Sequence, residues 1–264
     1  MPPTRLLDCP GLPGETLEEK LLLAHDRRLN PMPAGGRLMR LGRFLRALGR
    51  PAQRGAPALA DALPWLMPKV RPYFEYEAFT LRTGKPAPEF RPLAGTLAVS
   101  LVLDLPNQDL DLGAAELQAW NADFDGLLQT ARQNLLARGG EQKFHAVGAG
   151  RYRSAWRDGL DGSRILLPAM LRRLPLRGDP VVVLPTRDTL VVVGSEDPES
   201  LHWVLEDALR SLGDDPNPLN ACPLRLRNLH WEPFQAEDDQ PMGALLGRIE
   251  QRRLRDEHAR RKGL

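Results

Sequence analysis

Cysteine and long apolar runs are both scarce in this chain. Its 264 residues include two cysteines, Cys9 and Cys222, one near each end. Two cysteines provide neither the disulfide framework of a small secreted domain nor the ligand spacing of a zinc site, so we expect two reduced thiols rather than a bridge from tail to core. No apolar run approaches the ~20 residues that a membrane-spanning helix needs.

The features of an export signal and of a cofactor site are also missing. The first residues carry acidic, proline and glycine residues where a signal peptide has its apolar stretch, so we expect a cytoplasmic protein. The five histidines are scattered without ligand spacing, and no glycine-rich loop precedes a Lys-Ser/Thr pair that opens a helix. The sequence therefore predicts no cofactor and no metal.

Three aspartates are the nearest approach to a cation site. Asp104, Asp109 and Asp111 lie close together, and carboxylates can bind a divalent cation. Their spacing matches no calcium-binding loop, so a solvated strand edge is the favoured interpretation.

Positive charge is concentrated near the two ends of the chain. The net charge of +2 is too small to imply a polyanionic partner by itself. From Arg27 to Ala60, however, the chain has eight arginines and no acidic residue, and from Arg248 to Lys262 it has seven basic and three acidic residues. This distribution indicates that a binding site for an anionic partner would lie near one of the two ends of the chain.

The stretch Arg37–Arg50 is predicted to form a basic amphipathic helix. Its apolar residues fall on one side of a helical circumference, and arginines lie opposite. Such a helix can bind a protein partner, an anionic membrane surface or nucleic acid, the last through Arg37 to Arg54, or it can pack on the domain with a solvated basic face. A protein partner is favoured over the other two. The predicted contact residues are Arg37, Arg40, Arg43, Arg46 and Arg50.

The most apolar stretch, Asp179–Ser195, is predicted to form a buried β-hairpin. Two runs rich in valine, 181–184 and 190–193, flank a turn that contains Pro185 and Asp188. Because neither run alternates apolar with polar residues, both faces of the hairpin should be covered.

Other patterns surround this hairpin with strands and helices. We expect strands at 70–82 and 96–105, a short edge strand at 109–112, a strand pair at 144–156, and one strand with a bulge at Asn228 over 224–234. Helices are expected at 114–120, 124–137, 163–174, 198–212 and 241–264. The predicted fold class is α+β, with a mixed or antiparallel sheet built around the hairpin at about 180–194, packed by helices, and with helical N- and C-terminal extensions.

The same patterns divide the chain into three parts. Residues 1–68 are predicted to be a leader rich in proline and glycine with basic amphipathic helices, residues 69–235 an α+β core domain, and residues 236–264 a basic C-terminal helix.

Two polar clusters are candidate ligand sites. Arg187 and Asp188 lie in the turn between the buried strands, where a guanidinium group can bind a carboxylate or phosphate. Asp161 and Arg164 add a carboxylate and a cation from upstream. The structural alternative is that Asp188 accepts hydrogen bonds within its turn, Arg187 pairs locally, and Asp161 or Ser163 caps a helix.

The region 95–235 resembles the YtpQ family of bacterial proteins, which is built on a domain of unknown function. The residues that carry the resemblance are 163–164 and 166–168, Gly178-Asp179-Pro180, the motif from Pro185 to Leu190 and 193–195, with 103–106 and 131–135 upstream. The resemblance implies a fold and a cytosolic setting, and no activity, cofactor or catalytic residue.

Three hypotheses about function follow. The first is a non-enzymatic cytosolic binding or adaptor protein that uses its basic helical extensions, because no catalytic constellation accompanies them. The alternative is an enzyme for small molecules or phosphoesters, with Arg187, Asp188 and Asp161 in one cleft. The second alternative is nucleic-acid binding through Arg37–Arg54.

Overall fold

The computed structural model describes residues 57–105, 108–139, 143–214, 219–236 and 240–262. The predicted basic helix with Arg37, Arg40, Arg43, Arg46 and Arg50 lies outside these residues, and so does Cys9. No helix in the described ranges combines the length and the apolar character that crossing a membrane requires.

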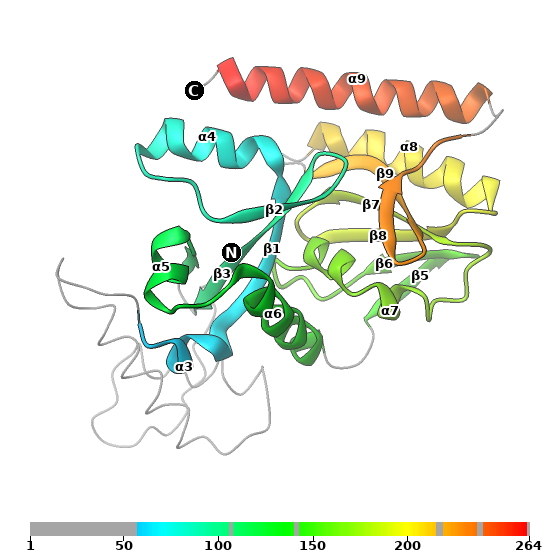
Figure 1. Ribbon diagram of the computed structural model, residues 1–264. Helices are drawn as coiled ribbons and strands as arrows, with labels where there is room; N and C mark the ends of the chain where they lie inside the picture. The colour runs from blue at the N-terminus through cyan, green and yellow to red at the C-terminus, as the bar shows by residue number, and fades with distance from the viewer. Residues whose placement is uncertain (1–56, 106–107, 140–142, 215–218, 237–239, 263–264) are drawn as a thin grey trace, which may run out of the picture.

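The described strands form two antiparallel sheets, which confirms the α+β fold class (Figure 1). The first sheet consists of β1 (Leu66–Pro72), β3 (Leu97–Leu105), β2 (Phe90–Ala94) and β4 (Gln108–Asp111). The second has the order β10 (His230–Pro233), β9 (Asn220–Arg227), β7 (Pro180–Thr186), β8 (Thr189–Gly194), β6 (Arg151–Ser154) and β5 (Phe144–Gly148).

Helices and 3-10 turns cover these sheets. They are α3 (Leu59–Ala62), η1 (Leu63–Trp65), α4 (Tyr73–Thr83), α5 (Ala114–Ala119), α6 (Phe124–Gly139), η2 (Gly162–Leu166), α7 (Pro168–Leu171), α8 (Pro198–Asp214) and α9 (Gln240–Lys262). The predicted domain boundary at residue 68 falls inside β1, so the folded body begins earlier than the composition of the chain indicates.

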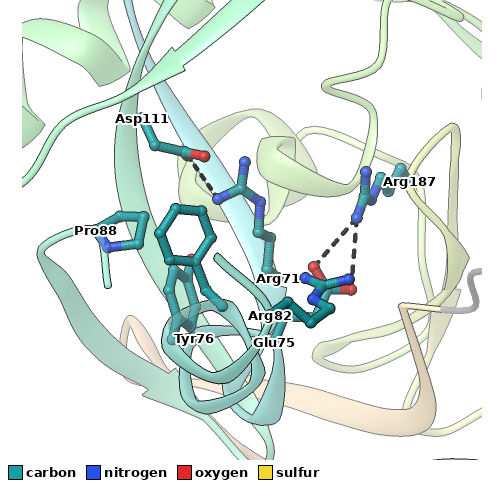
Figure 2. Close-up of a pocket in the computed structure, with 8 residues that line it drawn as sticks. Arg71, Glu75, Tyr76, Arg82, Pro88, Asp111 and Arg187 are labelled. Carbon is teal, nitrogen blue, oxygen red and sulfur yellow. Dashed lines mark hydrogen bonds and ion pairs between the residues drawn. The ribbon is translucent and has the colours of Figure 1, made fainter. Parts of the chain in front are cut away.

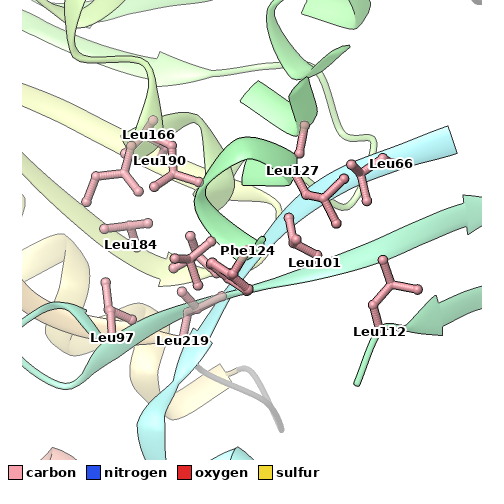
Figure 3. Packing of buried hydrophobic residues seen from close by; sticks show 14 of the residues in the cluster. Leu66, Leu97, Leu101, Leu112, Phe124, Leu127, Leu166, Leu184, Leu190 and Leu219 are labelled. Atoms are coloured by element: carbon pink, nitrogen blue, oxygen red, sulfur yellow. The ribbon is translucent and has the colours of Figure 1, made fainter. Parts of the chain in front are cut away.

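The predicted hairpin is confirmed, with Val181 opposite Val193 and Val182 opposite Val192. Its side chains point alternately into two cores. Val182 and Leu184 join the core shared with the first sheet, part of which is shown in Figure 3. Val181 and Val183 face a second core formed with α8 and α9. Both faces are therefore covered, as the lack of alternation predicts.

The C-terminal helix is confirmed, and its first half belongs to the second core. Met242, Leu245 and Ile249 of α9 are buried with the apolar residues of α8 and the hairpin. The far end of α9 lies beside α4, where Arg261 forms an ion pair with Glu77 at 3.1 Å (Figure 1). This helix is thus an integral part of the fold as well as an extension.

The strand predicted over 70–82 is wrong beyond Pro72, where the chain turns into α4. Tyr73, Tyr76 and Phe79 recur every three residues, which suits a helix better than a strand. Proline at the residue before the helix and Gly84 at its C-terminal cap, with a φ of 64°, set the two ends. Tyr76 packs on Phe90 of β2 with ring centroids 4.5 Å apart.

The single strand predicted over 224–234 is wrong as well, because two strands form there. β9 and β10 pair as a hairpin, and its turn consists of Asn228 and Leu229 with φ angles of 48° and 66°. Two positive φ angles produce the turn that matches strand twist.

The predicted helix over 163–174 is divided into η2 and α7, because Leu167 precedes Pro168 and adopts a non-helical conformation. The predicted caps are wrong too: neither Asp161 nor Ser163 caps η2. The Ser163 hydroxyl instead accepts a hydrogen bond from the Val70 backbone N–H at 3.1 Å. This serine therefore links η2 to the free edge of β1.

Candidate functional site

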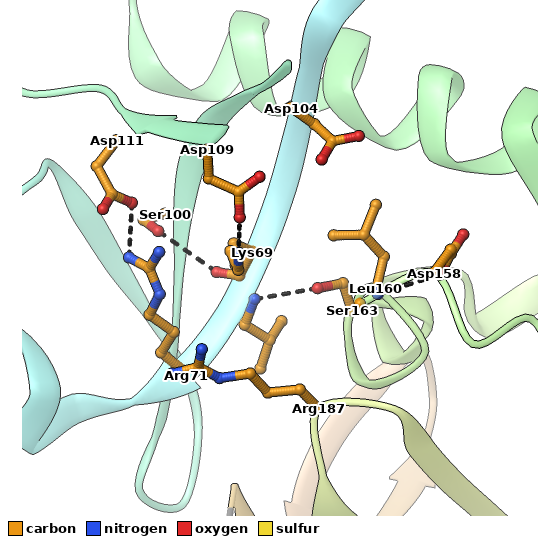
Figure 4. Close-up of polar contacts among 12 residues, drawn as sticks. Lys69, Arg71, Ser100, Asp104, Asp109, Asp111, Asp158, Leu160, Ser163 and Arg187 are labelled. Atoms are coloured by element: carbon orange, nitrogen blue, oxygen red, sulfur yellow. Dashed lines mark hydrogen bonds and ion pairs between the residues drawn. The ribbon is translucent and has the colours of Figure 1, made fainter. Parts of the chain in front are cut away.

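A row of charged side chains lies on one face of the first sheet. Lys69 and Arg71 project from β1, and each forms an ion pair with a carboxylate of β4 (Figure 4). Lys69 binds Asp109, and Arg71 Nη1 lies 2.6 Å from Asp111 Oδ1. Both pairs cross β3 diagonally, because Lys69 and Arg71 lie opposite Ser100 and Ala98 of β3, whereas Asp109 and Asp111 lie opposite Asp104 and Val102.

The cations of this row lie close enough to influence one another. Burial lowers the pKa of Lys69, and the positive charges of Arg71 and Arg187 lower it further. Burial alone would lower the pKa of Arg71 too, but its ion pair with Asp111 outweighs burial and raises that pKa. The face is therefore rich in positive charge that its own carboxylates compensate pair by pair.

Arg187 approaches this face from the second sheet. It lies between β7 and β8, and its Nη2 donates to both carboxylate oxygens of Glu75, at 3.1 and 3.4 Å. Glu75 belongs to the first turn of α4, 112 residues away in the sequence. The pair connects the turn of the buried hairpin with the helix that follows β1.

A hollow of about 230 Å³ opens between these elements (Figure 2). Three guanidinium groups line it, those of Arg71, Arg82 and Arg187, and they come from β1, α4 and the turn after β7. Two carboxylates line it as well, and both are already in ion pairs. The complete lining is Arg71, Glu75, Tyr76, Phe79, Arg82, Pro88, Asp111 and Arg187.

Arg82 differs from the other two arginines of the hollow. It is exposed in the last turn of α4, and it forms no ion pair with any residue that the structure describes. The hollow therefore has one more guanidinium group than its own carboxylates neutralise.

Tyr76 contributes a buried aromatic ring and a buried hydroxyl group to the lining. Its ring stacks on Phe90 with an angle of 23° between planes. Its hydroxyl is buried and has no hydrogen-bond partner among the described residues. Burial disfavours the phenolate and raises the pKa of Tyr76 to about 12, so the hydroxyl keeps its proton throughout the physiological range.

Of the four residues predicted to bind a ligand, Arg187 lines the hollow. Asp188 accepts a hydrogen bond from the backbone of Gly159 at 2.9 Å. Asp188 and Arg187 therefore both bind residues that are distant in sequence. The structural alternative predicted contacts within the turn for both. The backbones of the two clusters do meet, because Gly162 N–H donates to the Arg187 carbonyl at 3.0 Å.

Asp161 and Arg164 lie inside the protein. Asp161 is fully buried and accepts hydrogen bonds from the backbones of Trp156 and Asp158, at 3.2 and 3.4 Å, and burial raises its pKa. Arg164 is likewise buried, over the Trp156 ring at 4.1 Å from its centroid. Neither residue is among those that line the hollow.

Arg71, Glu75 and Arg82 were not predicted as site residues, because the pattern of residues 70–82 predicts a single strand. A usable pattern was present: Lys69 and Arg71, like Asp109 and Asp111, are two residues apart, and side chains two residues apart in a strand share a face. Within the described ranges, no group of three or more His, Cys, Asp or Glu side chains is arranged to hold a metal ion.

Comparison with protein-family models, curated proteins and solved structures gives no match for this chain. The resemblance to the YtpQ family remains a prediction.

Proposed function

We propose that this protein binds a small anionic ligand in the hollow lined by Arg71, Arg82 and Arg187. The observation that carries the proposal is the meeting of three guanidinium groups from three separate elements around one hollow, one of them without a carboxylate partner among the described residues. Guanidinium groups suit carboxylates and phosphates because their N–H donors match the spacing of the oxygens.

The size of the hollow favours a small ligand. Sites for drug-sized molecules have volumes of roughly 300–1,000 Å³. The volume here, about 230 Å³, is below that range. A ligand that enters would touch α4, β1 and the β7–β8 turn together, and its binding should stabilise their arrangement.

Chemical composition favours binding over catalysis. The lining contains no serine, cysteine, histidine or lysine, and Glu75 and Asp111 are both engaged by arginine. A nucleophile beside a free general base, which covalent or acid–base catalysis would use, is not among these eight residues. The composition of the lining therefore favours anion binding over covalent or acid–base chemistry within this hollow.

The partner-binding role of the basic helices remains a separate prediction. Arg37–Arg50 lies outside the described residues, and the cytoplasmic setting and the nucleic-acid alternative also remain predictions. Steep salt dependence of an electrophoretic shift would support nucleic-acid binding.

Calorimetric titration tests the proposal. The protein is titrated at low ionic strength with phosphate, citrate, acetate and benzoate, and at least one anion should bind saturably. Arg82→Gln should weaken that binding tenfold or more, whereas Arg173→Gln, which removes an exposed arginine of the turn after α7, should not. Absence of binding for every anion, or binding indifferent to Arg82, would show the proposal to be wrong.

A further inference from the structure

The balance of charge around the hollow limits the charge of its ligand. Arg71 is paired with Asp111 and Arg187 with Glu75. Lys69, on the same strand face as Arg71, is paired with Asp109. Arg82 alone among these cations has no carboxylate among the described residues, so a single negative charge completes the pairing.

A dianion would compete with the carboxylates already present. To use two guanidinium groups, it must take Arg187 from Glu75 or Arg71 from Asp111. Glu75 and Asp111 are largely covered, with side chains 17% and 25% exposed. A carboxylate left there without its arginine is poorly compensated by water, so displacement is unfavourable. The charge pattern therefore favours a monoanion.

The remainder of the lining is suited to a flat apolar body. Half-buried Phe79 contributes apolar surface, and the buried side chains of Pro88 and Tyr76 complete the apolar part of the lining, with the Tyr76 ring held in place by Phe90. Phe90 is in turn contacted edge-on by Tyr73, at 5.3 Å between centroids. The accessible part of the Phe79 ring is the surface against which another aromatic ring can pack.

A carboxylate suits this single cation, because its two oxygens match the spacing of the N–H donors of the Arg82 guanidinium group.

We infer that the ligand is a flat, aromatic monocarboxylate, whose carboxylate binds Arg82 and whose ring packs against Phe79. This inference rests on the proposed function and specifies the class of anion that the hollow accepts.

Calorimetric titration with four anions tests this inference, because the anions differ separately in charge and in shape. Benzoate has the ring and one carboxylate, phthalate has the same ring and two, acetate has one carboxylate without a ring, and phosphate has neither ring nor carboxylate. Benzoate should bind at least tenfold more tightly than each of the other three. Arg82→Gln should weaken benzoate tenfold or more, and Arg173→Gln should leave it unchanged.

A second variant tests the apolar half of the inference. Phe79→Leu keeps an apolar side chain on α4 and removes the ring, so it should weaken benzoate severalfold and leave acetate unchanged. Thermal melting of each variant verifies that it is folded before its affinity is compared.

The outcomes separate this inference from the proposed function. Tighter, Arg82-dependent binding of phthalate or phosphate would overturn the monocarboxylate class and leave anion binding intact. Equal binding of acetate and benzoate would overturn the aromatic class only. If none of the four anions binds, or if binding is indifferent to Arg82, both proposals are wrong.

Discussion

Arg164 is enclosed by the protein and paired with Asp158. Its Nη1 and Nη2 donate to the two carboxylate oxygens, at 2.9 and 2.7 Å, and its side chain is 0% exposed. The guanidinium plane also lies over Trp156, while its Nε has no hydrogen-bond partner among the described residues. One carboxylate and one aromatic face thus compensate a fully buried positive charge.

Removing the carboxylate should destabilise the protein severely. In Asp158→Asn, the Arg164 charge stays buried and loses its counterion, which typically costs about 3–5 kcal/mol of unfolding free energy. Urea unfolding monitored by circular dichroism measures the change. Asp256→Asn, which breaks the partly exposed Arg252–Asp256 pair of α9, is the control and should cost less than ~1 kcal/mol. Equal effects would show that burial of Arg164 is not what matters.

The same pair predicts how stability changes in acid. Burial alone would raise the pKa of Asp158, but the hydrogen bonds and charge of Arg164 outweigh it and lower that pKa below its ordinary value of 3.8. A carboxyl whose pKa is lower in the folded state stabilises the fold above its unfolded pKa, and this stability is lost as the pH falls through the folded pKa. Unfolding measured from pH 6 to pH 2 should therefore show a loss below about pH 4 that Asp158→Asn reduces.

Tyr76 predicts a loss of stability in base. Its pKa is raised from 10.0 to about 12, so above pH 10 the unfolded chain releases its proton more readily than the folded protein. Stability is full below pH 10 and falls as the pH rises towards 12, by about 2–3 kcal/mol in all. Tyr76→Phe should reduce this loss, and at pH 7 it should be neutral or slightly stabilising because the hydroxyl has no hydrogen-bond partner in the part of the chain that the structure describes.

Tyrosine absorbance gives a direct measurement of the same effect. The chain has three tyrosines, so one third of the phenolate signal should titrate late in the wild type and be missing from the variant. If all the tyrosines titrate together near pH 10, Tyr76 is not buried as described.

Two apolar residues of α9 should differ greatly in how much they stabilise the fold. Ile249 is 0% exposed in the core with α8, whereas Leu254, little more than one turn later, is 51% exposed. Ile249→Ala should cost about 2–5 kcal/mol, and Leu254→Ala should change stability by less than ~0.5 kcal/mol. Thermal and urea unfolding of both variants measures the difference. A small effect of Ile249→Ala would show that α9 is a dispensable appendage.

Much of the fold is visible in the sequence because it is encoded locally. The hairpin of Val182 and Val192, strand β3 and helices α6 and α8 each show their own periodicity and their own end residues, and all were predicted. Where a short stretch fits both the helical and the strand spacing of apolar residues, its pattern alone does not predict which structure forms. The stretch after Pro72 has partial alternation, yet the helical spacing of Tyr73, Tyr76 and Phe79 prevails, and the rings of Tyr73 and Tyr76 pack on Phe90 of β2.

The candidate site could be predicted only in part, because distant segments assemble it. Arg187 was identified from its turn between buried strands, but its partner Glu75 is 112 residues away and Arg71 depends on the pairing of β1 with β3. Asp161 and Arg164 were also selected as polar residues near a turn. Polarity does not reveal that both are buried and satisfied within the fold. Only packing decides which polar residues face solvent.

The turn between β9 and β10 predicts a stabilising substitution. Leu229 has a φ of 66°, a left-handed conformation that costs a side-chain-bearing residue roughly 1–2 kcal/mol, and its side chain is 59% exposed. Glycine adopts this conformation without steric cost, and Asn-Gly is the favoured pair for such a turn. Because little apolar burial is lost, Leu229→Gly should raise the free energy of unfolding by about 0.5–1 kcal/mol.

Leu254→Gly is the matched control for that substitution. It makes the same chemical change at another exposed leucine, but in the interior of α9, where glycine costs roughly 1 kcal/mol. The two substitutions should therefore change the urea midpoint in opposite directions, since backbone conformation is the main difference between the two positions. A loss of stability in Leu229→Gly as large as that in the control would mean that the turn does not hold Leu229 at positive φ in solution.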